Sequence, residues 1–132
     1  MQWKDDTELD VPSRLQAFAR LSDGWLNAEG LALSADGLAW FSSSFANRWP
    51  VSIPLPYVYP TLAGGVHLEW SFPTASACAE VDLTRRTAGL TVSRTTDGEL
   101  LEEGDIDLVS PGGWIALAEA IGRYGRPGNA LN

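Results

Sequence analysis

The sequence Gly64-Gly65-Val66-His67-Leu68-Glu69-Trp70-Ser71-Phe72 carries the clearest strand pattern in the chain. Successive side chains of a strand point to opposite faces, so its apolar residues share one face with a period of two. The polar residues His67, Glu69 and Ser71 share the other face. The pattern predicts a strand over residues 65–72 that turns one face to the core and leaves the other available.

Three further segments repeat this alternation, over residues 77–84, 88–95 and roughly 100–108. Short turn-forming sequences separate them, which is typical of consecutive antiparallel strands. The four segments together predict an antiparallel meander of about four strands.

Two places depart from this simple pattern. The alternation breaks at Leu100-Leu101-Glu102-Glu103, so we expect a bulge near Gly104 or a wider hairpin at Asp97-Gly98. The segment Tyr57-Val58-Tyr59 lies among prolines, which cannot donate to a strand ladder. We expect it to form at most a short edge strand.

Three other segments have the apolar spacing of amphipathic helices. The first begins near Pro12, the second follows Ser34 and stops at Pro50, and the third follows Ser110-Pro111. The apolar stripes of these helices match the apolar face of the sheet. We therefore predict an α+β domain in the order α-α-β-β-β-β-α, with the helices packed on one face.

Composition indicates one folded domain with an acidic surface. Hydrophobic residues make up 45% of the 132 residues, and we place the domain at residues 11–125, between an acidic lead-in at 1–10 and a tail at 126–132. Seventeen acidic and nine basic residues give a net charge of −8. This charge disfavours binding to nucleic-acid phosphates or anionic lipid and favours a basic protein partner or a small ligand.

The sequence also bears on the cellular compartment. Cys78 is the one cysteine, so it has no partner for an intrachain disulfide, and no basic start followed by an apolar segment opens the chain. No apolar run approaches the ~20 residues of a membrane span. We expect a cytoplasmic protein, and we expect Cys78 to be an inert thiol because acidic neighbours disfavour its thiolate.

The candidate site lies on the polar face of the predicted sheet. If residues 73–76 form the turn, Glu69 lies opposite Glu80 and His67 lies opposite Asp82. This cluster has two interpretations, a site for acid–base chemistry or a divalent metal with Glu69 and Glu80 as weak candidate ligands, and a solvated acidic face. No known metal spacing such as His-Glu-x-x-His is present, and no catalytic residue or cofactor is assigned.

Four short motifs stand along the chain in the order Gly24-Trp25, Pro60-Thr61, Leu68-Glu69-Trp70 and Glu80-Val81-Asp82. They resemble the motifs of a family of small bacterial proteins that has no established activity. In that family a Gly-Trp-Asp-Gly segment, a Pro-Thr segment, a Leu-Glu-Trp strand and an acidic strand recur in this order. Here Leu26-Asn27 stands in place of the Asp-Gly. The resemblance implies an association with mobile or defence-related gene neighbourhoods.

Two function hypotheses follow. The first is a non-enzymatic interaction protein of a bacterial accessory or defence-type system, which binds a basic protein through the acidic sheet face. The second is a small metal-assisted hydrolase or ligand-binding enzyme that uses the His/Glu/Asp cluster. A flat exposed face favours the first and an enclosed pocket favours the second. The candidate contact residues are His67, Glu69, Glu80 and Asp82, together with Tyr57 and Tyr59 at the sheet edge.

Overall fold

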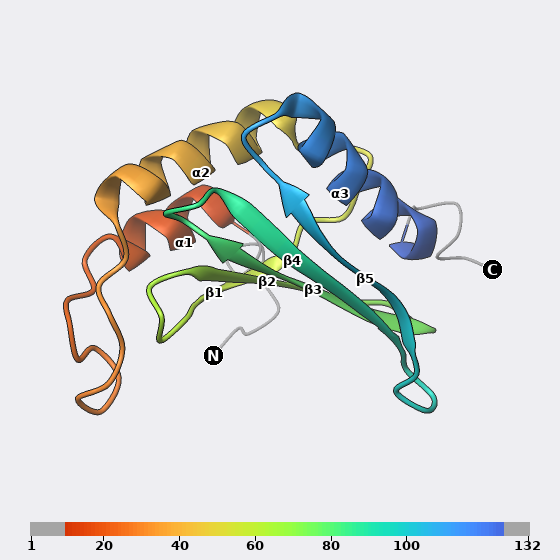
Figure 1. The fold of residues 1–132 in the computed structure, drawn as a ribbon, viewed down its shortest axis with the longest axis horizontal. Coiled ribbons are helices and arrows are strands. Elements are labelled where there is room, and N and C mark those ends of the chain that lie inside the picture. Colours follow the sequence, from red (N-terminus) through yellow and green to blue (C-terminus); the bar gives the residue numbers. More distant parts are fainter. Residues whose placement is uncertain (1–9, 126–132) are drawn as a thin grey trace.

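The computed structural model describes residues 10–125, which form an α+β fold with an antiparallel sheet in the order β1-β2-β3-β4-β5 (Figure 1). The predicted lead-in, apart from Asp10, and the predicted tail lie outside the described residues. No helix of the described chain is long and apolar enough to cross a membrane. The elements are α1 (Val11–Phe18), α2 (Ala35–Arg48), β1 (Tyr57–Pro60), β2 (Val66–Ser71), β3 (Ala75–Asp82), β4 (Thr87–Arg94), β5 (Leu100–Asp107) and α3 (Pro111–Gly125).

The helices begin at the residues that the capping signals predict. The Asp10 side chain accepts a hydrogen bond from the Ser13 backbone N–H at the start of α1. Ser34 does the same for the Gly37 N–H at the start of α2, with a length of 3.0 Å. These side chains satisfy backbone donors that the first turn of a helix leaves free. Pro111 opens α3 because a first-turn residue needs no N–H.

All three helices lie on one face of the sheet, as predicted (Figure 1). The apolar side chains of β2 point to that face, and Trp70 is only 2% exposed. The Trp70 ring stacks on the Trp49 ring with a distance of 5.7 Å between centroids. The Phe45 ring also stacks on Trp49, at 5.3 Å. Aromatic packing between α2 and the sheet thus forms the middle of the core.

The sheet has five strands where about four were predicted, because Tyr57–Pro60 pairs with β2 as an edge strand. The Thr61 N–H donates to the Gly65 carbonyl at 3.0 Å, and this bond fixes which residues of β1 face β2. Because backbone bonding alternates along an antiparallel strand, the backbone groups of Tyr57 and Tyr59 point toward β2. The nitrogens of Pro56 and Pro60 point away from β2, to the outside of the sheet. The prolines therefore remove no ladder bond.

The predicted register of β2 and β3 is wrong by two residues. The Phe72 N–H donates to the Ala75 carbonyl at 2.8 Å, which leaves a loop of only Pro73-Thr74 instead of the expected 73–76. Glu69 consequently lies opposite Cys78, and His67 lies opposite Glu80. The faces are still correct, because a shift of two residues preserves the alternation.

Of the two expected irregularities, the wider hairpin at Asp97-Gly98 is present, because the Arg94 N–H donates to the Glu99 carbonyl at 2.8 Å and leaves residues 95–98 as the loop. The expected bulge lies at a different residue of β5. Val92 pairs with Glu102 and Ser93 pairs with Leu100, so Leu101 is the extra residue of a bulge, rather than a residue near Gly104. Beyond the bulge the alternation is regular. Odd-numbered residues of β5 face away from the helices, and even-numbered residues face α3.

Candidate functional site

The face of the sheet away from the helices, called here the open face, consists of polar side chains in rows that run across the strands. The strand register defines each row. One row contains Tyr59, His67, Glu80, Gly89 and Asp105; the next contains Tyr57, Glu69, Cys78, Thr91 and Glu103; and Asp82, Thr87 and Asp107 lie at one end.

His67 lies between two of the predicted carboxylates. Its Nδ1 contacts a carboxylate oxygen of Glu80, and its Nε2 lies 3.3 Å from Oε1 of Glu69. The histidine side chain is 24% exposed, against 46% for Glu69 and 58% for Glu80. The Tyr59 ring lies beside it, with 6.1 Å between ring centroids. The structure thus brings His67, Glu69, Glu80 and Tyr59 together.

Asp82 has a structural contact instead of a place beside His67. Its Oδ1 accepts hydrogen bonds from the backbone N–H groups of Thr84 and Arg85, both at 3.0 Å. This is the local bonding by which an aspartate stabilises a turn. Asp82 therefore shapes the β3–β4 hairpin and belongs to the open face only at its margin.

Glu103 and Asp105 are open-face carboxylates that the sequence analysis did not select. Both are exposed, and neither has a hydrogen bond or ion pair with another residue of the described chain. A Cβ built on Gly89 would lie 3.6 Å from Oδ1 of Asp105, so the Asp105 carboxylate extends over the space left by this glycine. In the sequence these acids alternate with Ile106 and Leu108, and this alternation could have placed them on the polar face of the sheet.

Cys78 lies in a shallow depression on the open face. Burial raises the pKa of the Cys78 thiol, and the charges of Glu80 and Glu69 raise it further. A raised pKa disfavours the reactive thiolate, and the inert thiol stays a prediction. The depression, which His67, Glu69 and Thr91 also line, has a volume of about 230 Å³, below the ~300 Å³ at which ligand pockets usually begin.

The same geometry bears on metal binding. Among residues 10–125 no group of three or more His, Cys, Asp or Glu side chains is arranged to hold a metal ion. Glu69 and Glu80, the weak candidate ligands, contact opposite nitrogens of the same imidazole, which keeps them apart.

The tyrosine edge is covered by an arginine. Nε and Nη2 of Arg14, in α1, donate to the Val58 carbonyl at 3.1 and 3.0 Å. The guanidinium also lies 5.9 Å from the Tyr59 ring centroid and 5.7 Å from that of Phe18. Tyr57 and Tyr59 contribute rings to the open face, while the backbone beside them is already bonded.

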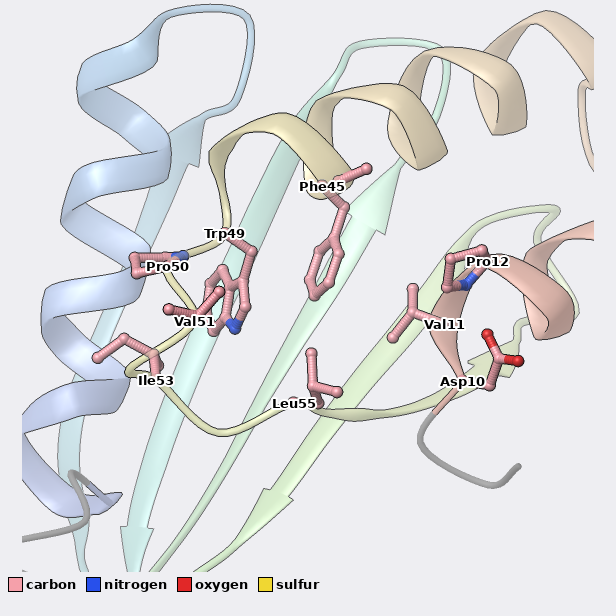
Figure 2. A pocket seen from close by; sticks show the side chains of 10 residues that line it. Asp10, Val11, Pro12, Phe45, Trp49, Pro50, Val51, Ile53 and Leu55 are labelled. Atoms are coloured by element: carbon pink, nitrogen blue, oxygen red, sulfur yellow. The ribbon is translucent and has the colours of Figure 1, made fainter. Parts of the chain in front are cut away.

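A separate apolar hollow of about 470 Å³ lies on the helix side of the sheet (Figure 2). It lies between the start of α1, with Val11 and Pro12, and the end of α2, with Phe45 and Trp49. Its one titratable residue, Asp10, already accepts hydrogen bonds from Ser13. The hollow thus has no free group for acid–base chemistry.

Comparison of the chain with protein-family models, with curated proteins and with solved structures found no match. Function must accordingly be inferred from the geometry of the open face, and the family resemblance of the short motifs stays a prediction.

Proposed function

We propose that this chain is a non-enzymatic interaction protein that binds a basic protein partner through the open face. The observation that carries this proposal is the unbalanced charge of that face. The carboxylates of Glu69, Glu80, Glu103 and Asp105 share it with a single imidazole, and no Lys or Arg occupies an open-face position within strands β1 to β5. A cationic partner would relieve the repulsion between these carboxylates.

The shape of the face also favours a macromolecule over a small substrate. The carboxylates of Glu69 and Glu80 are about half exposed, and the depression that Glu69 lines is small. Tyr57 and Tyr59 add aromatic rings next to the acids, and such rings bind guanidinium groups by cation–π attraction. The chain already uses this attraction, because Arg14 lies over Tyr59.

The biological setting is inferred from the sequence alone. The short motifs support a bacterial accessory or defence-type system, and the composition supports a cytoplasmic location. The genes beside this one in the source genome test the first inference. Fractionation of source cells tests the second.

A charge-reversal experiment with a matched control tests the binding proposal. The face variant is Glu69→Lys/Glu80→Lys. The control variant, Glu29→Lys/Glu119→Lys, changes the net charge equally at exposed residues outside the open face. Each protein is immobilised, incubated with lysate of source cells and eluted by increasing salt, which screens charge over a Debye length of about 8 Å at physiological ionic strength.

We expect wild-type protein and the control variant to retain the same basic protein, and the face variant to lose it. Circular dichroism should show the same fold for all three, because exposed strand positions tolerate such changes. Equal retention by all three proteins, or retention of acidic proteins only, would contradict the proposal.

A further inference from the structure

The two edges of the sheet differ in whether the backbone groups that point away from the sheet already have hydrogen-bond partners. At the β1 edge the carbonyl of Val58 accepts two hydrogen bonds from Arg14, and Pro56 and Pro60 have no N–H to offer. Helix α1 also packs against this strand. An added strand could therefore form few backbone bonds with β1.

The β5 edge is open. The Leu108 N–H donates to the Arg86 carbonyl at 3.0 Å, which sets the alternation of the β4–β5 ladder. Even-numbered residues such as Gly104 bond to β4, so Glu103 and Asp105 direct their N–H and carbonyl groups away from the sheet. No backbone group within residues 10–125 bonds to these outward groups.

Helix α3 closes this edge only at its end. A Cβ built on Gly113 would lie 1.7 Å from the Asp107 carbonyl oxygen, so the start of α3 lies directly against Asp107. Farther along α3, Arg123 and Tyr124 donate to the carboxylate of Glu102, which lies on the helix side of β5. Between these two contacts Glu103, Gly104 and Asp105 are exposed. The open part of the edge thus coincides with the two unpaired carboxylates.

We propose that β5 docks an extended, basic segment of a partner protein, which adds as a strand beside Glu103 and Asp105. This assignment rests on the proposed function and names where and how the basic partner binds. The outward backbone groups supply the hydrogen bonds of strand addition. The side chains of the same two residues lie on the open face, where directly opposed Lys or Arg residues of the added strand would neutralise them.

A second copy of this chain does not suit the edge. If two β5 strands paired antiparallel about Gly104, Glu103 of each copy would lie opposite Asp105 of the other. Like charges in directly opposed positions destabilise a pair of strands. The edge therefore disfavours its own copy and favours a cationic strand.

The experiment uses a defined probe, a short capped peptide that alternates lysine and threonine. Binding to the full chain is measured by fluorescence anisotropy at low salt, beside a peptide of the same sequence with alternate backbone nitrogens methylated. Two variants separate charge from backbone bonding: Asp105→Asn removes the charge and keeps the outward N–H, while Asp105→Pro removes both. Proline is tolerated there because the outward N–H makes no ladder bond.

We expect Asp105→Asn to weaken peptide binding roughly two- to fivefold, and Asp105→Pro to weaken it by about a further tenfold. The N-methylated peptide should bind wild-type protein as weakly as the parent peptide binds Asp105→Pro. In hydrogen exchange, the Glu103 and Asp105 amides should exchange fast in free protein and become protected by the parent peptide. Gly104 should be protected in both states.

Equal weakening by the two variants, or equal binding of the two peptides, would overturn the edge assignment. If Asp105→Pro does not fold, the two peptides on wild-type protein decide the question. The face variant could lose the basic lysate protein while the β5 amides of wild-type protein stay unprotected by the peptide. This pair of results would refute only the edge assignment. An intact lysate interaction in the face variant, with peptide loss in Asp105→Pro, would refute only the open-face proposal.

Discussion

Trp49 and Trp70 donate to the same acceptor, and this arrangement predicts how their substitutions combine. The Nε1 of Trp70 donates to the Pro54 carbonyl at 3.0 Å, and the Nε1 of Trp49 donates to it at 3.2 Å. A carbonyl oxygen can accept two hydrogen bonds, so either indole alone keeps Pro54 satisfied. Replacing both indoles by Phe should therefore cost more than the sum of the single replacements.

The structure gives the scale of this effect. Each Trp→Phe change removes an N–H and part of a buried ring, for about 1–2 kcal/mol of the free energy of unfolding. Only the double variant leaves the Pro54 carbonyl without either donor. Pro54 is half-buried, so the additional loss should be near the lower end of the usual penalty, about 1 kcal/mol. Trp70→Ala, at a position 2% exposed, should cost about 3–5 kcal/mol by itself.

Urea unfolding followed by circular dichroism measures these free energies, provided that the variants share one m-value. Trp25→Phe is the matched control. Its indole N–H also donates to a carbonyl, that of Leu31 at 2.9 Å, but its ring lies outside the buried core cluster. Combined with Trp70→Phe, it should be additive within about 0.5 kcal/mol. Additivity of the Trp49 and Trp70 changes as well would refute the shared acceptor.

Three other predictions concern the turn before β2, the β5–α3 contact and the open face. A Cβ at Gly65 would lie 2.5 Å from a carbonyl oxygen of β3, so Gly65→Ala should lower unfolding free energy by roughly 1–3 kcal/mol, whereas Gly104→Ala, with no atom within 4 Å, should be near neutral in urea titrations. A hydrogen bond from Arg123 is the main cause that lowers the pKa of Glu102 in the folded protein. The stabilisation from this interaction should be present above the unfolded-state pKa of about 4.3 and be lost as pH falls through the folded-state pKa. Glu102→Gln should remove this part of the pH dependence of thermal melting. Because burial raises the pKa of Cys78, alkylation by iodoacetamide should be slower than for free cysteine at neutral pH and should accelerate only at higher pH.

The faces of the sheet were predictable from the sequence, while the registers were not. Alternation places His67 and Glu69 on the polar face whatever residue lies opposite, because a shift of two residues leaves each side chain on its own face. The length of the loop sets the register, and alternation carries no information about that length. For this reason the prediction that Glu69 lies opposite Glu80 was wrong, although both side chains contact the imidazole of His67.

Contacts between distant segments were also beyond the sequence analysis. Arg14 and Val58 are 44 residues apart, so no local pattern could show that the arginine covers the β1 carbonyl. Glu103 and Asp105 were overlooked because the bulge at Leu101 interrupts the alternation just before them. The regular acidic pattern beyond the bulge would have placed them on the open face.

The acidic β5 edge has two physical interpretations, which differ in what they require of the backbone. Protection against edge-to-edge aggregation does not require outward N–H groups, because either a charged residue or a proline provides it. Docking of a strand requires outward N–H groups in addition. At the β1 edge, Pro56 and Pro60 occupy outward positions, while at the β5 edge Glu103 and Asp105 keep their N–H groups. The chain thus removes donors from the edge it covers and retains them at the edge it leaves open, a difference that favours docking.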